Sequence, residues 1–99
     1  MSKPFYSEYV RHCMRFYSRN PEEPRFNSSV DESNWYACHR AIGRYSDEEK
    51  RILIAVYSMY DTIADNVYEL ANLYHVDQNV IWDLIKGFER SVAKKRGLL

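Results

Sequence analysis

The sequence predicts an all-α protein, a compact bundle of about five helices that ends in a helix-turn-helix. Apolar residues recur at helical spacing through most of the chain, and no segment alternates apolar and polar residues for long enough to form a strand. Gly and Pro number only three each among the 99 residues, too few for the many turns of an all-β fold. Patterns typical of helix starts, such as Ser46 followed by Glu49, recur along the chain. The length allows a single domain covering residues 1–99.

The first helix is expected to begin near Pro4, which suits a first turn, with Ser2 as a possible cap. It should end at Asn20, because Pro21 disfavours α geometry in the residue before it. Helical spacing predicts an apolar stripe made of Phe5, Tyr9, Cys13 and Phe16, widened by Tyr6, Val10 and Tyr17.

Three arginines, Arg11, Arg15 and Arg19, follow one another at four-residue steps beside this stripe. With Lys3 and Glu8 they give residues 1–19 a net charge of +3. Two interpretations stay open, namely a solvated face opposite the core, or an edge that contacts phosphates or an acidic partner protein.

A loop over residues 20–28 leads to a second helix of about fifteen residues, opened by Ser29 and Glu32 and stopped near Gly43. A third helix follows Ser46 and Glu49. The core-facing residues of these two helices are expected to be Trp35, Cys38, Ile42 and Tyr45, then Ile52, Leu53, Val56, Tyr57 and Tyr60. Helices one to three (residues 1–60) would therefore supply most of the aromatic core.

Residues 61–99 are expected to form the helix-turn-helix and a basic C-terminal helix. A short fourth helix, with Asn66 and Glu69 at its start, ends at His75, and a long fifth helix runs from about Gln78 to Arg96. Gly87 lies within the fifth helix and makes a kink there conceivable. The buried residues of these helices are predicted to be Val67, Leu70, Ala71 and Tyr74, then Ile81, Leu84, Ile85, Phe88 and Val92.

Residues 67–86 resemble a helix-turn-helix in detail. Ala71 provides the small residue that two closely crossing helices need at their contact. His75 stands where the turn requires a positive φ, and His is enriched there among residues other than Gly. Val76 would fill the corner of the turn, and Asp77 is a good N-cap for the second helix.

The outer face of the fifth helix then predicts a site for double-stranded DNA. Amide side chains can hydrogen-bond to adenine edges in the major groove, and lysine can contact guanine or phosphate. Helix-turn-helix proteins often dimerise to cover two half-sites of a DNA operator, so a homodimer is expected with this function. The predicted DNA-binding residues are Gln78, Asn79, Trp82 and Lys86 in the groove, with Arg90, Lys94, Lys95 and Arg96 on phosphates.

Charge and composition support a second hypothesis, a protein-binding module that acts on a host protein without reading DNA. Lys plus Arg and Asp plus Glu both number 14, so the formal net charge is zero. Residues 61–85 contain five acidic residues and no Lys or Arg. Aromatic residues make up 15% of the chain, and exposed Tyr or Trp side chains near the acidic helix would form the centre of such an interface.

The C-terminal half, from Ser46 to Leu99, resembles the region-four-type helix-turn-helix of sigma-factor relatives and the short proteins of this kind that phages and conjugative elements encode. Residues 47–53 are similar to the leading helix of that unit, and residues 69–71 and 80–82 to its helix pair. The ending at 93–98 is also similar. The resemblance implies sequence-directed DNA binding in transcription control.

No cofactor, metal or enzymatic activity is expected from the sequence. His12 and Cys13, like Cys38 and His39, are adjacent, and adjacent helical residues point about 100° apart, so they cannot share one zinc ion. The cysteines are expected to be buried free thiols, and the three glycines are too scattered to cradle a phosphate. No membrane segment and no signal-peptide pattern is visible, which predicts a cytoplasmic protein.

Overall fold

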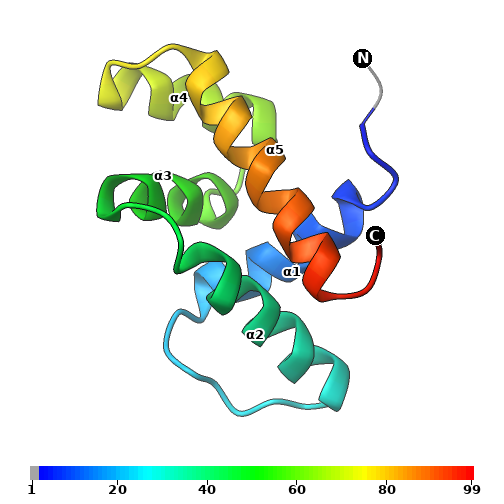
Figure 1. Ribbon diagram of the computed structural model, residues 1–99. Coiled ribbons are helices and arrows are strands. Elements are labelled where there is room, and N and C mark those ends of the chain that lie inside the picture. The colour runs from blue at the N-terminus through cyan, green and yellow to red at the C-terminus, as the bar shows by residue number, and fades with distance from the viewer. Residues whose placement is uncertain (1–2) are drawn as a thin grey trace.

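The computed structural model describes residues 3–99 and shows five α-helices, with no strand in that range. The all-α prediction is confirmed. In Figure 1, α1 and α2 lie at one end of the molecule, α4 lies at the other end with α3 between them, and α5 runs diagonally along all four. The helices are α1 (Ser7–Arg19), α2 (Ser29–Ile42), α3 (Asp47–Ser58), α4 (Ile63–Tyr74) and α5 (Gln78–Lys95).

The hydrophobic core is one continuous cluster to which all five helices contribute. Its largest fully buried side chains include Tyr57 of α3, Phe88 of α5 and Met14 of α1. Near one end, Trp35 packs against Tyr17 with ring centroids 5.2 Å apart, and its indole nitrogen donates to the Asn20 carbonyl oxygen at 2.8 Å. A large polar aromatic ring can be buried here because its N–H has a partner.

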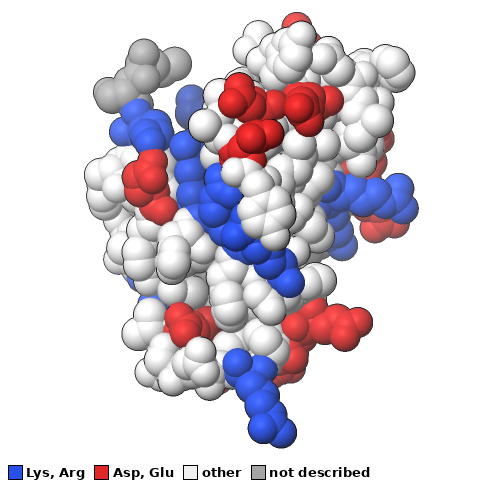
Figure 2. Space-filling model, turned by 180° about the vertical axis from the view of Figure 1, so that it is seen from behind, with Lys and Arg blue, Asp and Glu red and all other residues white. Residues whose placement is uncertain are grey.

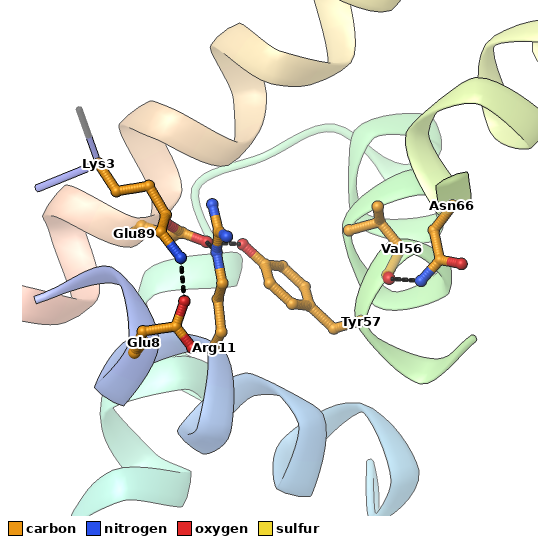
Figure 3. A network of polar contacts seen from close by, with 7 residues as sticks. All are labelled: Lys3, Glu8, Arg11, Val56, Tyr57, Asn66 and Glu89. Atoms are coloured by element: carbon orange, nitrogen blue, oxygen red, sulfur yellow. Dashed lines mark hydrogen bonds and ion pairs between the residues drawn. The ribbon is translucent and has the colours of Figure 1, made fainter. Parts of the chain in front are cut away.

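A buried carboxylate joins three helices at the centre of the bundle. Glu89 of α5 is only 3% exposed, and its Oε2 accepts from Arg11 Nε at 2.9 Å and from Tyr57 Oη at 2.7 Å. Figure 3 shows the Arg11 and Tyr57 side chains meeting at this oxygen from α1 and α3. Two effects raise the pKa of Tyr57 well above its ordinary value: mainly its burial, and in addition the negative charge of the nearby Glu89 carboxylate. The phenol therefore stays protonated and acts as a hydrogen-bond donor.

Side-chain caps begin four of the five helices, and two of them differ from the prediction. Ser46 and Glu49 form the predicted reciprocal capping box of α3. At α2, however, the cap is Ser28 and not Ser29, because the Ser28 hydroxyl accepts from the Asp31 amide. At α4 the cap is Thr62, one turn before the predicted Asn66.

Asn66 is fully buried within α4 and has a different role from the predicted cap. Its Nδ2 donates to the carbonyl oxygens of Val56 at 2.8 Å and Asp61 at 3.2 Å, as Figure 3 shows for Val56. These carbonyls lie at the C-terminal end of α3 and just beyond it, where they lack helical partners. Asn66 therefore ties α4 to the end of α3.

The buried face of α1 is rotated from its predicted position. Met14 is fully buried, whereas Tyr9 is 40% exposed and Phe5, which precedes the helix, is 78% exposed. Helical spacing placed Phe5 and Tyr9 in the buried stripe, but α1 packs through the adjacent face, which includes Val10, Met14 and Tyr17. The helix begins at Ser7 behind Tyr6, which supplies no side-chain cap, and the suggested cap Ser2 lies outside the described residues. The helix ends at Arg19 with Asn20 as its C-cap, within one residue of the predicted end at Asn20.

Further predictions about the core need correction. Tyr60 is 88% exposed, because α3 ends at Ser58 and the chain has turned outward. Glu89 takes a buried place that the predicted apolar stripe of α5 did not include. Helix α5 continues through Gly87 without a break. Four predicted core residues are only half-buried: Phe16, Tyr45, Tyr74 and Leu84.

The buried network makes a strong prediction for stability. Replacing Glu89 by Leu leaves the part-buried Arg11 charge and the buried Tyr57 hydroxyl without their acceptor, and we expect a loss of about 3–5 kcal/mol in the free energy of unfolding. Urea denaturation at pH 7 measures this loss. Adding Arg11→Met to Glu89→Leu removes the orphaned charge and should restore most of the stability. The control Arg90→Gln, on the exposed face of α5, should change stability by less than about 0.5 kcal/mol. A Glu89→Leu protein as stable as this control would contradict the role given to the network.

Candidate nucleic-acid interface

Helices α4 and α5 are joined by a tight three-residue turn whose geometry agrees with the sequence prediction. His75 adopts φ 56° and ψ 43°, the left-handed conformation predicted for this position. The Val76 amide then donates to the Ala71 carbonyl oxygen at 3.1 Å, and Asp77 caps α5 by accepting from the Asn79 amide at 2.7 Å. The turn fixes where α5 begins and which of its faces is buried against α4.

The residues predicted to contact bases lie along the first half of α5. Gln78 and Asn79 are exposed in its first turn, and Lys86 is exposed two turns later. Trp82 is half-buried, so that only part of its ring is available to a partner. The structure thus brings the predicted base-contacting residues together along one helix, with the two amides at its N-terminal end.

The residues predicted to contact phosphates divide into two groups. Arg90, Lys94 and Lys95 are exposed, and none of them forms an ion pair within residues 3–99. Lys86, Arg90 and Lys94 follow at four-residue steps and form one row, because residues four apart on a helix are neighbours. Arg96 differs, because its Nε donates to Asn34 Oδ1 of α2 at 2.6 Å and the residue is half-buried. Arg96 joins the end of α5 to α2.

Acidic side chains border this basic row at its N-terminal end. Asp83 is exposed on α5 next to Lys86, and Asp65 and Glu69 are exposed on α4. The local charge of the α4–α5 pair therefore changes from negative to positive along α5.

The arginine row of α1 has a structural role that neither sequence interpretation anticipated. Arg11 is paired with buried Glu89. Arg15 donates to the carbonyl oxygens of Tyr57 at 3.3 Å and Met59 at 3.1 Å, at the end of α3. A guanidinium group there satisfies carbonyls that have no helical partner and offsets the negative end of the helix dipole.

Arg19 completes the row, with its guanidinium carbon 4.4 Å from the centre of the Tyr60 ring. This cation–π contact explains how Tyr60 is held although most of its surface is exposed. Figure 2, which views the molecule from behind relative to Figure 1, shows basic side chains crossing the surface diagonally below a group of acidic ones. Of the three arginines, Arg11 and Arg15 are therefore neither freely solvated nor available as a phosphate-binding edge.

The residues considered for metal binding or catalysis lie in separate environments. Cys13 and Cys38 are buried, whereas His12 and His39 are exposed. His39 Nδ1 lies 2.9 Å from Tyr17 Oη, and its ring stacks on Trp35. Within residues 3–99, no three His, Cys, Asp or Glu side chains come close enough together to hold a metal ion. Over the same residues, none of the helices has the length and apolar character required to cross a membrane.

Comparison of this chain with protein-family models, with characterised proteins and with solved structures gives no match.

Burial of the two cysteines predicts that they are unreactive in the folded protein. Loss of solvation raises the pKa of Cys13 to about 11 and the pKa of Cys38 still further above its ordinary value. At pH 8 only about one Cys13 thiol in a thousand is then ionised, and the thiolate is the reactive form. With the disulfide reagent DTNB we expect both thiols to react at least about 100-fold more slowly in the native protein than in guanidinium. A thiol that reacts equally fast in the native and the denatured protein would contradict the burial of that cysteine and would support a role for it as a nucleophile.

Proposed function

We propose that this protein binds double-stranded DNA through the exposed face of α5 and acts as a transcriptional regulator. The observation that carries the proposal is the row of Lys86, Arg90 and Lys94, three exposed cations without acidic partners within residues 3–99. Cations spaced along one helix face can contact successive phosphates, and phosphate contacts supply much of the affinity of DNA-binding proteins. An origin in a phage or conjugative element has only the resemblance of residues 46–99 in its favour.

Sequence discrimination is assigned to the first turn of α5. Gln78 and Asn79 present two exposed amide side chains there, and such groups can make paired hydrogen bonds to adenine in the major groove. In helix-turn-helix proteins the N-terminal residues of the second helix contact base edges. The left-handed turn at His75 and the cap at Asp77 support this arrangement, because they place both amides at the exposed N-terminal end of α5.

A homodimer is part of the proposal. The net charge of the chain is zero, so a single copy has little long-range attraction for DNA. Two copies related by a two-fold axis would double the number of phosphate contacts and read two half-sites about one helical turn apart, roughly 34–36 Å.

The DNA hypothesis predicts that reversing two charges strongly weakens binding without unfolding the protein. For Lys86→Glu with Arg90→Glu, we expect affinity for a random-sequence duplex to fall by at least about 10-fold at low salt. The slope of log K against log salt should flatten by about two, one for each lost phosphate contact. Fluorescence anisotropy across a salt series measures both quantities, and circular dichroism tests the fold.

The matched control is Arg25→Glu with Arg44→Glu, which makes the same change in net charge at two exposed residues outside α5. This control should keep the affinity and the salt slope close to those of the unmodified protein. Equal losses in both double variants would show that only net charge matters. Unchanged binding by the folded α5 variant, or no binding by the unmodified protein at about 50 mM salt, would refute the proposal.

A second candidate function, binding to a host protein, is favoured by the outer surface of α4. Leu73 is 70% exposed and Tyr68 is 57% exposed, beside the exposed carboxylates of Asp65 and Glu69. Asp65, Glu69 and Leu73 lie in one row at four-residue steps. An exposed aromatic and an exposed leucine bordered by negative charge are suited to a partner with a basic, partly apolar surface.

The protein-binding candidate predicts that Tyr68→Ser with Leu73→Ser removes a specific partner. Both side chains are mostly exposed, so the change should alter stability little. Affinity capture with the unmodified chain as bait, followed by mass spectrometry, should recover a protein that the double variant does not. The control Val30→Ser with Leu99→Ser replaces two other exposed apolar residues and should retain that protein. Identical captured sets for both double variants would remove the support for α4 as a docking surface.

A further inference from the structure

A hollow of about 380 Å³ lies between the N-terminal end of α1 and the first half of α5. This volume falls within the range of sites that bind small molecules, about 300–1,000 Å³. Tyr6 and Ile85 give it apolar lining, and the half-buried Trp82 offers part of its ring. In Figure 1 the chain before α1 rises beside α5, so that the hollow has walls from both ends of the sequence.

Ser7, in the first turn of α1, also lines this hollow and has an unsatisfied hydroxyl. The residue is 1% exposed, and its Oγ has no hydrogen-bond partner. Buried polar side chains nearly always have a partner, so a group without one needs an explanation. The buried hydroxyl of Ser18, on the same helix, does donate to the Arg15 carbonyl oxygen at 3.1 Å. A ligand with an acceptor atom would satisfy Ser7.

One cation in the lining of the hollow is available to an anion. Lys3, Arg11 and Lys86 line it together with Asp83 and Glu89, and the ion pairs of Lys3 and Arg11 leave Lys86 and Asp83 as the remaining charges. Arg11 and Glu89 neutralise each other in their ion pair. Lys3 is paired with Glu8, which lies outside the lining, whereas Lys86 has no acidic partner within residues 3–99.

The N-terminus of helix α1 also lies at this hollow. Tyr6 at the N-cap provides no side-chain acceptor, unlike the caps of α2 to α5. The Ser7 amide donates to the Pro4 carbonyl oxygen at 3.1 Å. The other amides of the first turn carry partial positive charge, which Glu8 in the same turn partly offsets. Helix end, lysine and unsatisfied hydroxyl thus all border one hollow.

We propose that this hollow binds a small organic anion with a flat apolar body. The anionic group, a carboxylate or a phosphate monoester, accepts hydrogen bonds from Ser7 Oγ and Lys86 Nζ. The apolar body lies against Trp82 and Tyr6, where it replaces water on the exposed part of the indole. A ligand of about ten non-hydrogen atoms should bind with millimolar affinity or better.

Ligand binding and DNA binding would share residues, because Asn79, Trp82 and Lys86 line the hollow and also belong to the predicted DNA contacts. An anion bound at Lys86 would occupy a cation that the DNA complex needs, and would therefore weaken that complex. This regulatory consequence rests on the proposed function, whereas binding of the anion itself does not.

The test is an NMR titration of the unmodified protein, without DNA, with benzoate and with phenyl phosphate as probes. The two tryptophans give separate indole N–H signals. The Trp82 signal should shift saturably with at least one probe, and the signal of Trp35, buried among α1–α2 aromatics, should stay fixed. Benzoate and phenyl phosphate distinguish a carboxylate site from a phosphate site. Absence of a saturable Trp82 shift with both probes at about 10 mM would overturn the proposal.

Two variants and two further compounds locate the anion. Ser7→Ala and Lys86→Gln should each weaken the responding probe by about 10-fold, whereas the control Lys94→Gln, on the same helix but outside the hollow, should not. Ser7→Ala removes an unsatisfied group, so this variant should fold at least as stably as the original. Equal affinity for uncharged benzyl alcohol would overturn the anionic half of the proposal. Equal affinity for inorganic phosphate would overturn the apolar half.

Discussion

The buried carboxylate of Glu89 is the interaction on which the arrangement of this bundle depends. A carboxylate removed from water is strongly destabilising unless a cation and hydrogen-bond donors compensate it. Arg11 and Tyr57 provide both, at 2.9 Å and 2.7 Å. Because these residues belong to α1 and α3, the compensation exists only when both helices are correctly placed against α5. An alternative packing of the same apolar surfaces would leave the charge unpaired, so the network selects one packing among several.

The same constraint determines which residues α5 presents to solvent. Glu89 must face inward together with Ile85, Phe88 and Val92, and this orientation leaves Lys86, Arg90 and Lys94 outside. The arginines of α1 are drawn in the opposite direction, with Arg11 on Glu89 and Arg15 on the end of α3. The basic rows of α1 and α5 look alike in the sequence but have different structural roles. The row of α1 stabilises the bundle, and the row of α5 remains available to a partner.

Local signals in the sequence predict most of the fold, and long-range polar contacts account for the missed roles of Glu89 and the α1 arginines. The left-handed turn at His75 and the capping box at Ser46 depend on neighbouring residues and are correctly predicted. Ser28 and Ser29 are chemically equivalent as caps, so the sequence alone could not choose between them. Arg11 and Glu89 are 78 positions apart, and each has the composition of a surface residue until the tertiary structure brings them together. The candidate residues of α5 were predictable because helical spacing alone separates its outer from its inner face, but the hollow beside it was not.

Charge along α5 gives the proposed DNA complex a basis for specificity. The exposed carboxylates of Asp83 beside Lys86 and of Asp77 at the N-cap oppose the approach of phosphates to the N-terminal half of the helix, because charges are felt over a screening length of about 8–10 Å. Non-specific binding depends almost entirely on phosphate contacts, so these acidic groups weaken it. A specific site would recover the lost affinity through base contacts made by Gln78 and Asn79. In the proposed complex, repulsion of phosphates near the start of α5 lowers the affinity for every DNA site, and only a site that also hydrogen-bonds with Gln78 and Asn79 regains that affinity.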